Sequence, residues 1–150
     1  MDNTRSIGPG RILVVERDLA VARFAQFVLG TWEAFDVTSV TEPAVVLSRI
    51  ETEPWDLVLV DFELPGPGAQ GSQGPEGTFD AMGLMAAIRE AEPRLPVAMM
   101  TASPVTGPAA ESLGAADGHV TKPIIPSHLI GLATGLIEQF RRAREQAGGC

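Results

Sequence analysis

The chain has 150 residues, a length that fits one compact domain. It carries 11 Lys and Arg against 19 Asp and Glu, a formal net charge of −8, and 45 % of its residues are hydrophobic, which is enough for a buried core. Because an acidic surface repels phosphate backbones, this charge argues against sequence-independent binding of nucleic acids.

The number of cysteines and the hydropathy of the chain argue against a disulfide-bonded, exported or membrane-spanning protein. The single cysteine is Cys150, which excludes an intrachain disulfide and a cysteine-based metal site and suits a reducing cytoplasm. The polar start of the chain has no apolar core typical of an export signal, and no apolar run approaches the roughly 20 residues that span a bilayer. We therefore expect a cytoplasmic domain without a membrane segment.

Short apolar runs alternate along the chain with segments of helical period. Continuous runs of about four apolar residues are typical of strands buried on both faces, as in a parallel sheet covered by helices. The expected strands are 12–15, 35–40, 57–60, 97–100 and 118–121.

The first helix is predicted from apolar residues at positions 21, 24, 25 and 28, with Asp18 before it as a cap and Gly30 closing it. Thr41 offers a cap, and Pro43 an early helical proline, for a second short helix that reaches Ile50. Further helices are expected at about 79–91, at 108–113 and from 126 to 146. The last of these carries a basic cluster that we expect on a solvated helix face: Arg141, Arg142 and Arg144.

Five strands alternating with five helices imply right-handed crossovers and a three-layer α/β sandwich. In such open sheets, ligands bind beyond the carboxyl ends of the strands. The polar residues that follow the predicted strands are therefore the candidates for function. They are Glu16, Arg17 and Asp18 after the first, Asp61 after the third, Thr101 after the fourth and Lys122 after the fifth.

This set of side chains has a known chemical logic. A carboxylate can attack a phosphoryl group and form an aspartyl phosphate. A cation must neutralise the transferred group, usually Mg²⁺ held by one or two carboxylates and several waters. A lysine and a hydroxyl can then hold the remaining phosphoryl oxygens.

At these strand ends the sequence resembles the receiver domains of two-component response regulators, over residues 11 to about 146. The resemblance implies a flavodoxin-like (βα)5 fold, with a five-stranded parallel sheet in the strand order 2-1-3-4-5. The segments that carry it are 12–16 (ILVVE), 56–66 (DLVLVDFELPG), 100–102 (MTA) and 114–123 (GAADGHVTKP).

The resemblance also implies a role for each matching residue. Asp61 corresponds to the phosphoacceptor, and Thr101 to the switch hydroxyl that closes on the phosphoryl group. Lys122 corresponds to the lysine that pairs with that group, and the peptide bond to the following proline is often cis in the family. His119 stands where the family usually has an aromatic switch residue, so it is a second candidate switch.

A magnesium site is implied in the same way. Its expected ligands are the carboxylates of Glu16 and Asp61 and the backbone carbonyl of Glu63. The family normally has two adjacent acids after the first strand, but here the second is Arg17. A permanent positive charge in the pocket repels a divalent cation, so we expect weak binding of Mg²⁺.

The effect of Arg17 on the pocket depends on where its guanidinium lies. It can swing into solvent and leave a weakened metal site, or it can pair with Asp61 or Glu16 and fill the metal position, where it would serve as a phosphoryl clamp or lock the pocket without phosphate. Alternatively Asp18 turns inward and replaces the lost acid. The expectation that Asp18 caps the first helix argues against that replacement.

The sequence predicts a single receiver domain at 11–147, between a disordered tail at 1–10 and a short tail at 148–150. Between Asp61 and Arg89 it is about a dozen residues longer than the family pattern. The surplus, at about 67–77, is rich in Gly and Pro and is expected as a loop. A tolerated surface insertion is the simplest interpretation; a lid over the pocket and a partner-binding segment are alternatives.

These features favour a stand-alone receiver domain that relays a signal by binding proteins and is not itself an enzyme. The expected partners are a sensor histidine kinase or phosphotransfer protein and an unidentified downstream protein, and the last helix suggests a homodimer. One alternative is a pseudo-receiver that binds its partner without phosphorylation. Others are an aspartate-nucleophile phosphohydrolase, whose nucleophile usually follows the first strand, and a flavin or nucleotide binder, for which residues 16–18 form a poor anion site.

Overall fold

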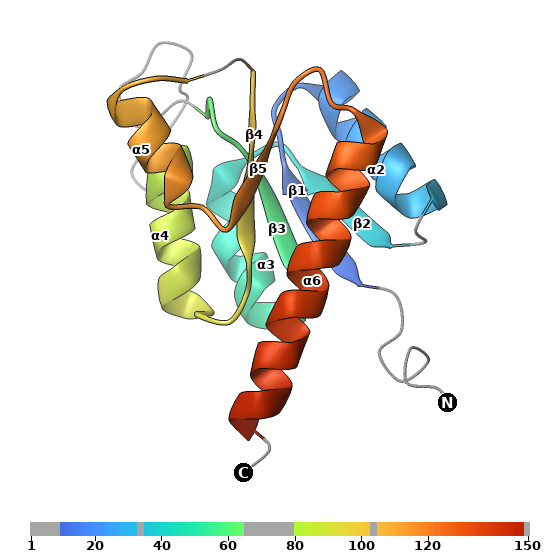
Figure 1. Cartoon of the computed structure of the whole chain (residues 1–150), viewed down its shortest axis with the longest axis vertical. Helices are drawn as coiled ribbons and strands as arrows, with labels where there is room; N and C mark the ends of the chain where they lie inside the picture. Colours follow the sequence, from blue (N-terminus) through green and yellow to red (C-terminus); the bar gives the residue numbers. More distant parts are fainter. Residues whose placement is uncertain (1–9, 33–34, 65–79, 103–104, 149–150) are drawn as a thin grey trace.

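The computed structural model describes residues 10–32, 35–64, 80–102 and 105–148. A central parallel sheet has the strand order β2-β1-β3-β4-β5 (Figure 1). The predicted α/β fold class and strand order are therefore confirmed. The strands are β1 (Arg11–Val15), β2 (Asp36–Val40), β3 (Leu57–Asp61), β4 (Val97–Thr101) and β5 (Gly118–Thr121).

Helices cover both faces of the sheet, because alternate residues of each strand point to opposite sides. Ile12 and Val14 pack toward α2 and α6, whereas Leu13 and Val15 pack toward α3 and α4. All four side chains are fully buried, as expected for a strand between two helical layers. The helical elements are α2 (Leu19–Trp32), a 3-10 turn η1 (Pro43–Val45), α3 (Val46–Thr52), α4 (Ala81–Ala91), α5 (Pro108–Gly114) and α6 (Pro126–Gly148).

Two predicted helix ends differ from the structure. The prediction that Gly30 closes the first helix is wrong, because α2 continues through Gly30 to Trp32. The chain then returns to β2, and the N–H of Phe35 donates to the carbonyl of Leu29 at 3.1 Å. The second helix starts as the 3-10 turn at Pro43. Its N-cap residue is Glu42, which makes no side-chain cap hydrogen bond, and not the expected Thr41.

The structure also bears on the predictions about membrane segments, the insertion and the ends of the chain. In the part of the chain that the structure describes, no helix is long and apolar enough to cross a membrane. The predicted insertion at 67–77 lies outside the described residues. So do residues 1–9 of the tail predicted at 1–10 and residues 149–150 of the tail predicted at 148–150.

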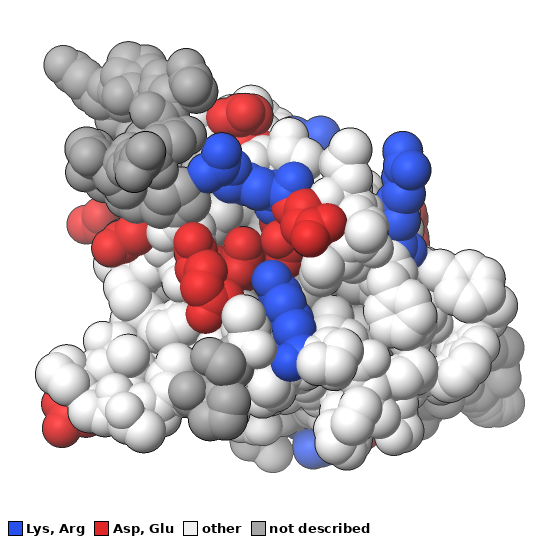
Figure 2. Space-filling model, turned by 90° about the horizontal axis from the view of Figure 1, so that it is seen from above, with Lys and Arg blue, Asp and Glu red and all other residues white. Residues whose placement is uncertain are grey.

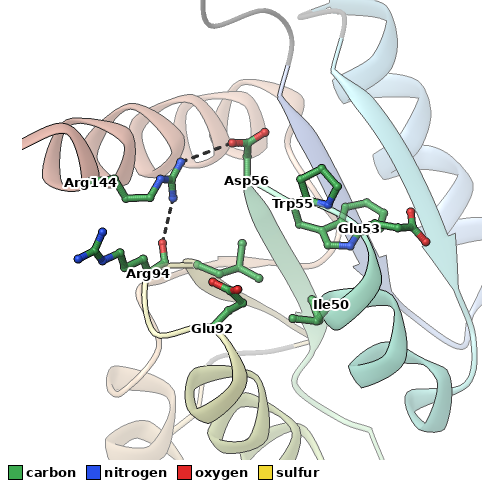
Figure 3. Close-up of a pocket in the computed structure, with 9 residues that line it drawn as sticks. Ile50, Glu53, Trp55, Asp56, Glu92, Arg94 and Arg144 are labelled. Atoms are coloured by element: carbon green, nitrogen blue, oxygen red, sulfur yellow. Dashed lines mark hydrogen bonds and ion pairs between the residues drawn. The ribbon is translucent and has the colours of Figure 1, made fainter. Parts of the chain in front are cut away.

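The arginines of α6 reach the opposite end of the sheet from the predicted site. Asp56, just before β3, accepts a hydrogen bond from the N–H of Arg11 at 2.9 Å and pairs with Arg141 at 3.3 Å and with Arg144 at 3.6 Å. Arg144 also donates to the carbonyl of Arg94 at 3.0 Å (Figure 3). The expectation that Arg141 and Arg144 lie on a solvated face is therefore wrong, because their guanidinium groups form ion pairs with Asp56 just before β3.

Replacing Asp56 with alanine is expected to lower the free energy of unfolding by about 1–3 kcal/mol, because Asp56→Ala removes a backbone hydrogen bond and two ion pairs at once. Urea denaturation measures the loss. The matched control is Asp36→Ala, which removes an exposed carboxylate 3.5 Å from Arg11 and is expected to cost less than about 0.5 kcal/mol. Equal losses in the two variants would contradict a special role for Asp56.

Candidate functional site

The carboxyl ends of the strands open onto one face of the molecule. Figure 2 views this face, where acidic side chains gather near the centre and Lys and Arg side chains lie around them. A pocket of about 580 Å³ lies here. It is lined by Glu16, Arg17, Asp18, Asp61, Glu63, Ala102 and Lys122.

Lys122 joins the two buried carboxylates of this pocket. Its Nζ lies 2.9 Å from Oε1 of Glu16 and 3.2 Å from Oδ1 of Asp61. Glu16 is 1 % exposed and Asp61 7 % exposed, so neither charge is solvated well by water. Lys122 is also the only lysine in the chain. The structure thus brings together three residues that the sequence singled out, from the ends of β1, β3 and β5.

The protonation of these groups follows from their burial and from their pairing. Burial raises the pKa of Glu16, the nearby charge of Asp61 raises it further, and the hydrogen bonds from Lys122 and Asp18 offset only part of the rise. Burial alone would lower the pKa of Lys122. The contacts with Glu16 and Asp61 together outweigh that effect, so the pKa of Lys122 is raised and its ammonium form is stabilised.

Asp18 is engaged by the start of α2. Its Oδ1 accepts hydrogen bonds from the N–H groups of Ala20, at 2.9 Å, and Val21, at 3.4 Å, as an N-cap residue does. Its own N–H donates to Oε2 of Glu16 at 3.1 Å. These contacts agree with the predicted capping role and not with an Asp18 that replaces the missing acid.

Glu63 links the ends of β3 and β4, a role that the sequence interpretation missed. Its N–H donates to Oδ1 of Asp61 at 3.0 Å. Its carboxylate accepts hydrogen bonds from the hydroxyl of Thr101, at 3.2 Å, and from the N–H of Ala102, at 3.1 Å. The sequence pointed only to its backbone carbonyl. No local sequence pattern predicts the contact of the Glu63 carboxylate with Thr101 and Ala102. It depends on the pairing of β3 with β4, which places Asp61 beside Met100.

The two predicted switch residues lie at different depths. Thr101 is buried at the end of β4, whereas His119 is exposed on β5. Both line a second hollow of about 360 Å³ between α5 and β5, together with Leu113 and Thr121. His119 therefore lies next to Thr101 but outside the pocket of Asp61.

The described residues fit a divalent cation poorly. Among them, no group of three His, Cys, Asp or Glu side chains is placed to hold a metal ion. The two buried carboxylates, those of Glu16 and Asp61, already share the ammonium of Lys122. Arg17 adds a second basic side chain to the lining of the same pocket. The pocket thus supplies positive charge from its own side chains.

Comparison with known proteins adds a family match and structural relatives. The family model described as "Response regulator receiver domain" matches residues 12–134. No curated protein is significantly similar to the chain in sequence. Similar solved structures include a CheY-like response regulator receiver domain protein from Methanospirillum hungatei JF-1, with 22 % identity, a TM-score of 0.72, and coverage of 91 % of this chain and 99 % of that one.

Two other relatives share the same fold. The receiver domain of the Francisella response regulator 1452 has 22 % identity and a TM-score of 0.68, and the match covers 87 % of this chain and 98 % of that one. NtrX from Brucella abortus, solved in complex with ATP, has 24 % identity and a TM-score of 0.77. That match covers 92 % of this chain but only 29 % of NtrX, so this chain resembles one part of the longer protein.

Replacing Lys122 with methionine is expected to destabilise the protein most strongly near neutral pH. Lys122→Met leaves two buried carboxylates without their cation, which we expect to cost about 2–3 kcal/mol at pH 7. When a carboxyl group has a raised pKa in the folded state, the protein becomes less stable as the pH rises through that pKa. The stability deficit of Lys122→Met relative to the native chain should therefore shrink as the pH falls and Glu16 takes up a proton.

Urea denaturation of both proteins at several pH values measures this deficit. The control is Lys122→Arg, which keeps the charge and should retain most of the stability. A deficit that stays constant between pH 7 and acidic pH would contradict the ion-pair account and would indicate a loss of packing alone.

Proposed function

Because the chain belongs to the response regulator receiver domain family, we propose that it relays a two-component signal through protein contacts and that Asp61 is its phosphoacceptor. The observation that carries this proposal is the arrangement of the Asp61 carboxylate. Asp61 is buried at the pocket floor, and one of its oxygens, Oδ1, accepts from both Lys122 Nζ and the N–H of Glu63. These contacts orient the other oxygen, Oδ2, as the nucleophile.

The chemical step is a transfer of one phosphoryl group. Oδ2 of Asp61 attacks phosphorus and forms a new O–P bond, while the bond from phosphorus to the donor's leaving group breaks and that group departs with the electron pair. Lys122 neutralises part of the charge on the transferred group. Thr101, at the end of the neighbouring strand, then donates its hydroxyl to a phosphoryl oxygen, and the α5 and β5 surface that carries His119 changes shape for the downstream partner.

Arg17 sets the metal dependence of this step. In the family, Mg²⁺ bound beside the phosphoacceptor supplies positive charge to the phosphoryl group. Here Arg17 lines the pocket where a second acid is usual, and Glu16 and Asp61 are paired with Lys122. We therefore expect weak binding of Mg²⁺ through Glu16, Asp61 and the carbonyl of Glu63, with Arg17 and Lys122 as the main counter-charges.

Exposed apolar side chains close in sequence to two pocket residues support a protein partner. Leu19, which directly follows Asp18 at the start of α2, is 53 % exposed, and Phe27 on the same helix is 60 % exposed. Ile125, three residues beyond Lys122, is 50 % exposed. Because large exposed apolar side chains are typical of protein interfaces, we assign Leu19 and Ile125 to the contact with the phosphodonor, a histidine kinase or phosphotransfer protein.

A second candidate function is a pseudo-receiver that binds its partner without phosphorylation. The observation that favours it is that Lys122 already pairs with both Asp61 and Glu16, so the Asp61 carboxylate has a cationic partner before any phosphoryl group arrives. In either case the proposed role is signalling in the cytoplasm by binding, not catalysis of a metabolic reaction. A homodimer through α6 remains part of the proposal, but Arg141 and Arg144 are not assigned to it, since both contact Asp56 of their own chain.

Intact-mass spectrometry after incubation with acetyl phosphate, with and without Mg²⁺, tests the proposed function. The native chain is expected to gain one phosphoryl group slowly and with little dependence on Mg²⁺, and the Asp61→Asn variant none. Arg17→Asp should restore a second acid, raise the affinity for Mg²⁺ by about ten-fold or more, and make phosphorylation both faster and dependent on Mg²⁺.

The matched control is Arg23→Asp, which makes the same charge change at an exposed position of α2 that does not line the pocket. A native chain that stays unmodified, beside a phosphorylated Arg17→Asp variant, would favour the pseudo-receiver. Equal rates and equal dependence on Mg²⁺ in the native, Arg17→Asp and Arg23→Asp proteins would contradict the role given to Arg17.

A further inference from the structure

The side chain of Glu63 lies across the gap between the ends of β3 and β4. Each of its two carboxylate oxygens accepts one hydrogen bond from the neighbouring strand end: Oε2 from the hydroxyl of Thr101 at 3.2 Å, and Oε1 from the N–H of Ala102 at 3.1 Å. The donors are adjacent in sequence, and Ala102 lines the pocket of Asp61. One anionic group thus accepts from two donors at the end of β4, the strand that pairs with the strand of Asp61.

These donors are of the kind that a phosphoryl group on Asp61 requires. A phosphoryl group carries two or more negative charges on oxygens, and it is stabilised by N–H and O–H groups fixed in advance. Ala102 lines the pocket of Asp61, and Asp61 pairs in register with Met100, the residue just before Thr101. The hydroxyl and the N–H therefore belong to the strand end that lies beside the strand of Asp61.

The backbone of Glu63 ties this contact to Asp61. The N–H of Glu63 donates to Oδ1 of Asp61 at 3.0 Å, while its carboxylate holds Thr101 and Ala102. Glu63 is separated from Asp61 by a single residue, so its carboxylate shares the pocket with the nucleophile. A group placed in this way mimics the charge and the hydrogen-bond acceptors of a phosphoryl group before any is present.

We propose that the Glu63 carboxylate is an internal substitute for the phosphoryl group, which holds Thr101 and Ala102 in a closed arrangement in the unmodified protein. A phosphoryl group arriving at Asp61 must displace it to gain the same two donors. Glu63 also adds a negative charge that repels the incoming anion. The competition between Glu63 and an incoming phosphoryl group rests on the proposed function. The hydrogen bonds of Glu63 with Thr101 and Ala102 do not depend on phosphorylation.

The contact of the Glu63 carboxylate with Thr101 and Ala102, here called the clamp, gives these two donors the same kind of partner with and without phosphorylation. With Glu63 in place, Thr101 and Ala102 have an anionic acceptor in both the unmodified and the phosphorylated protein. The unmodified chain therefore already holds part of the geometry that phosphorylation would otherwise induce. A downstream partner that contacts this end of β4 is expected to bind the unmodified chain appreciably, as an equilibrium shifted toward one state predicts.

Two measurements on the same variants test this inference, and only the second needs phosphorylation. The first is amide hydrogen exchange at Ala102, followed by NMR in the unmodified protein. Glu63→Ala removes the acceptor and should speed exchange at Ala102 about five- to ten-fold. Glu63→Gln keeps one acceptor oxygen and should speed it less.

The second measurement is the rate at which acetyl phosphate modifies Asp61, followed by intact mass. Both Glu63→Ala and Glu63→Gln should be modified several-fold faster than the native chain, because each removes the competing charge. The matched control is Glu138→Ala, which removes an exposed glutamate of α6 far along the sequence from the pocket and should change neither quantity.

The outcomes separate the two proposals. Unchanged exchange at Ala102 in Glu63→Ala would overturn the clamp, whatever happens to phosphorylation. Faster exchange with an unchanged or slower modification of Asp61 would overturn the competition. If no variant is ever modified, the phosphoacceptor proposal fails, and faster exchange at Ala102 still supports Glu63 as a permanent clamp of a pseudo-receiver.

Discussion

The ammonium group of Lys122 lies between two buried carboxylates, and the site depends on this contact. Glu16 ends β1, Asp61 ends β3 and Lys122 follows β5, so the contact forms only when three strands are aligned at the same edge of the sheet. Removing the cation would leave negative charge without compensation in a region of low dielectric. The core thus places the strand ends, and the ion pairs in turn hold the Asp61 carboxylate in the pocket.

The pocket also contains two charged side chains that could stand in for a bound metal ion and for a phosphoryl group. Arg17 brings a positive charge to the place of an acid, and Glu63 brings a negative charge to donors that suit a phosphoryl group. If Asp61 is phosphorylated as proposed, both side chains act on the same equilibrium as the phosphoryl group. The proposed response to phosphorylation is then less steep, because the equilibrium between the two states is already biased.

The sequence predicted the layers and the order of the fold well, because buried strands are runs of apolar residues and caps such as Asp18 have local signatures. It predicted less well where distant charges decide the outcome. Arg141 and Arg144 looked solvated in sequence, but Asp56, far away along the chain, binds both. The Glu63 side chain was missed for the same reason, since its partners are set by strand pairing and not by spacing. The helix α2 continues past Gly30 to Trp32, and Gly30 does not adopt the left-handed conformation that a C-capping glycine usually has.

The central claim, that Lys122 is an ammonium group shared by Glu16 and Asp61, can be tested directly because the chain contains no other lysine. Labelling with ¹³Cε-lysine gives a single resonance, and its titration by NMR reports the pKa of Lys122 alone. The account predicts a midpoint above that of a solvent-exposed lysine, about 10.4, and a lower midpoint in the Asp61→Asn variant. A midpoint at or below the ordinary value, unchanged by Asp61→Asn, would contradict it.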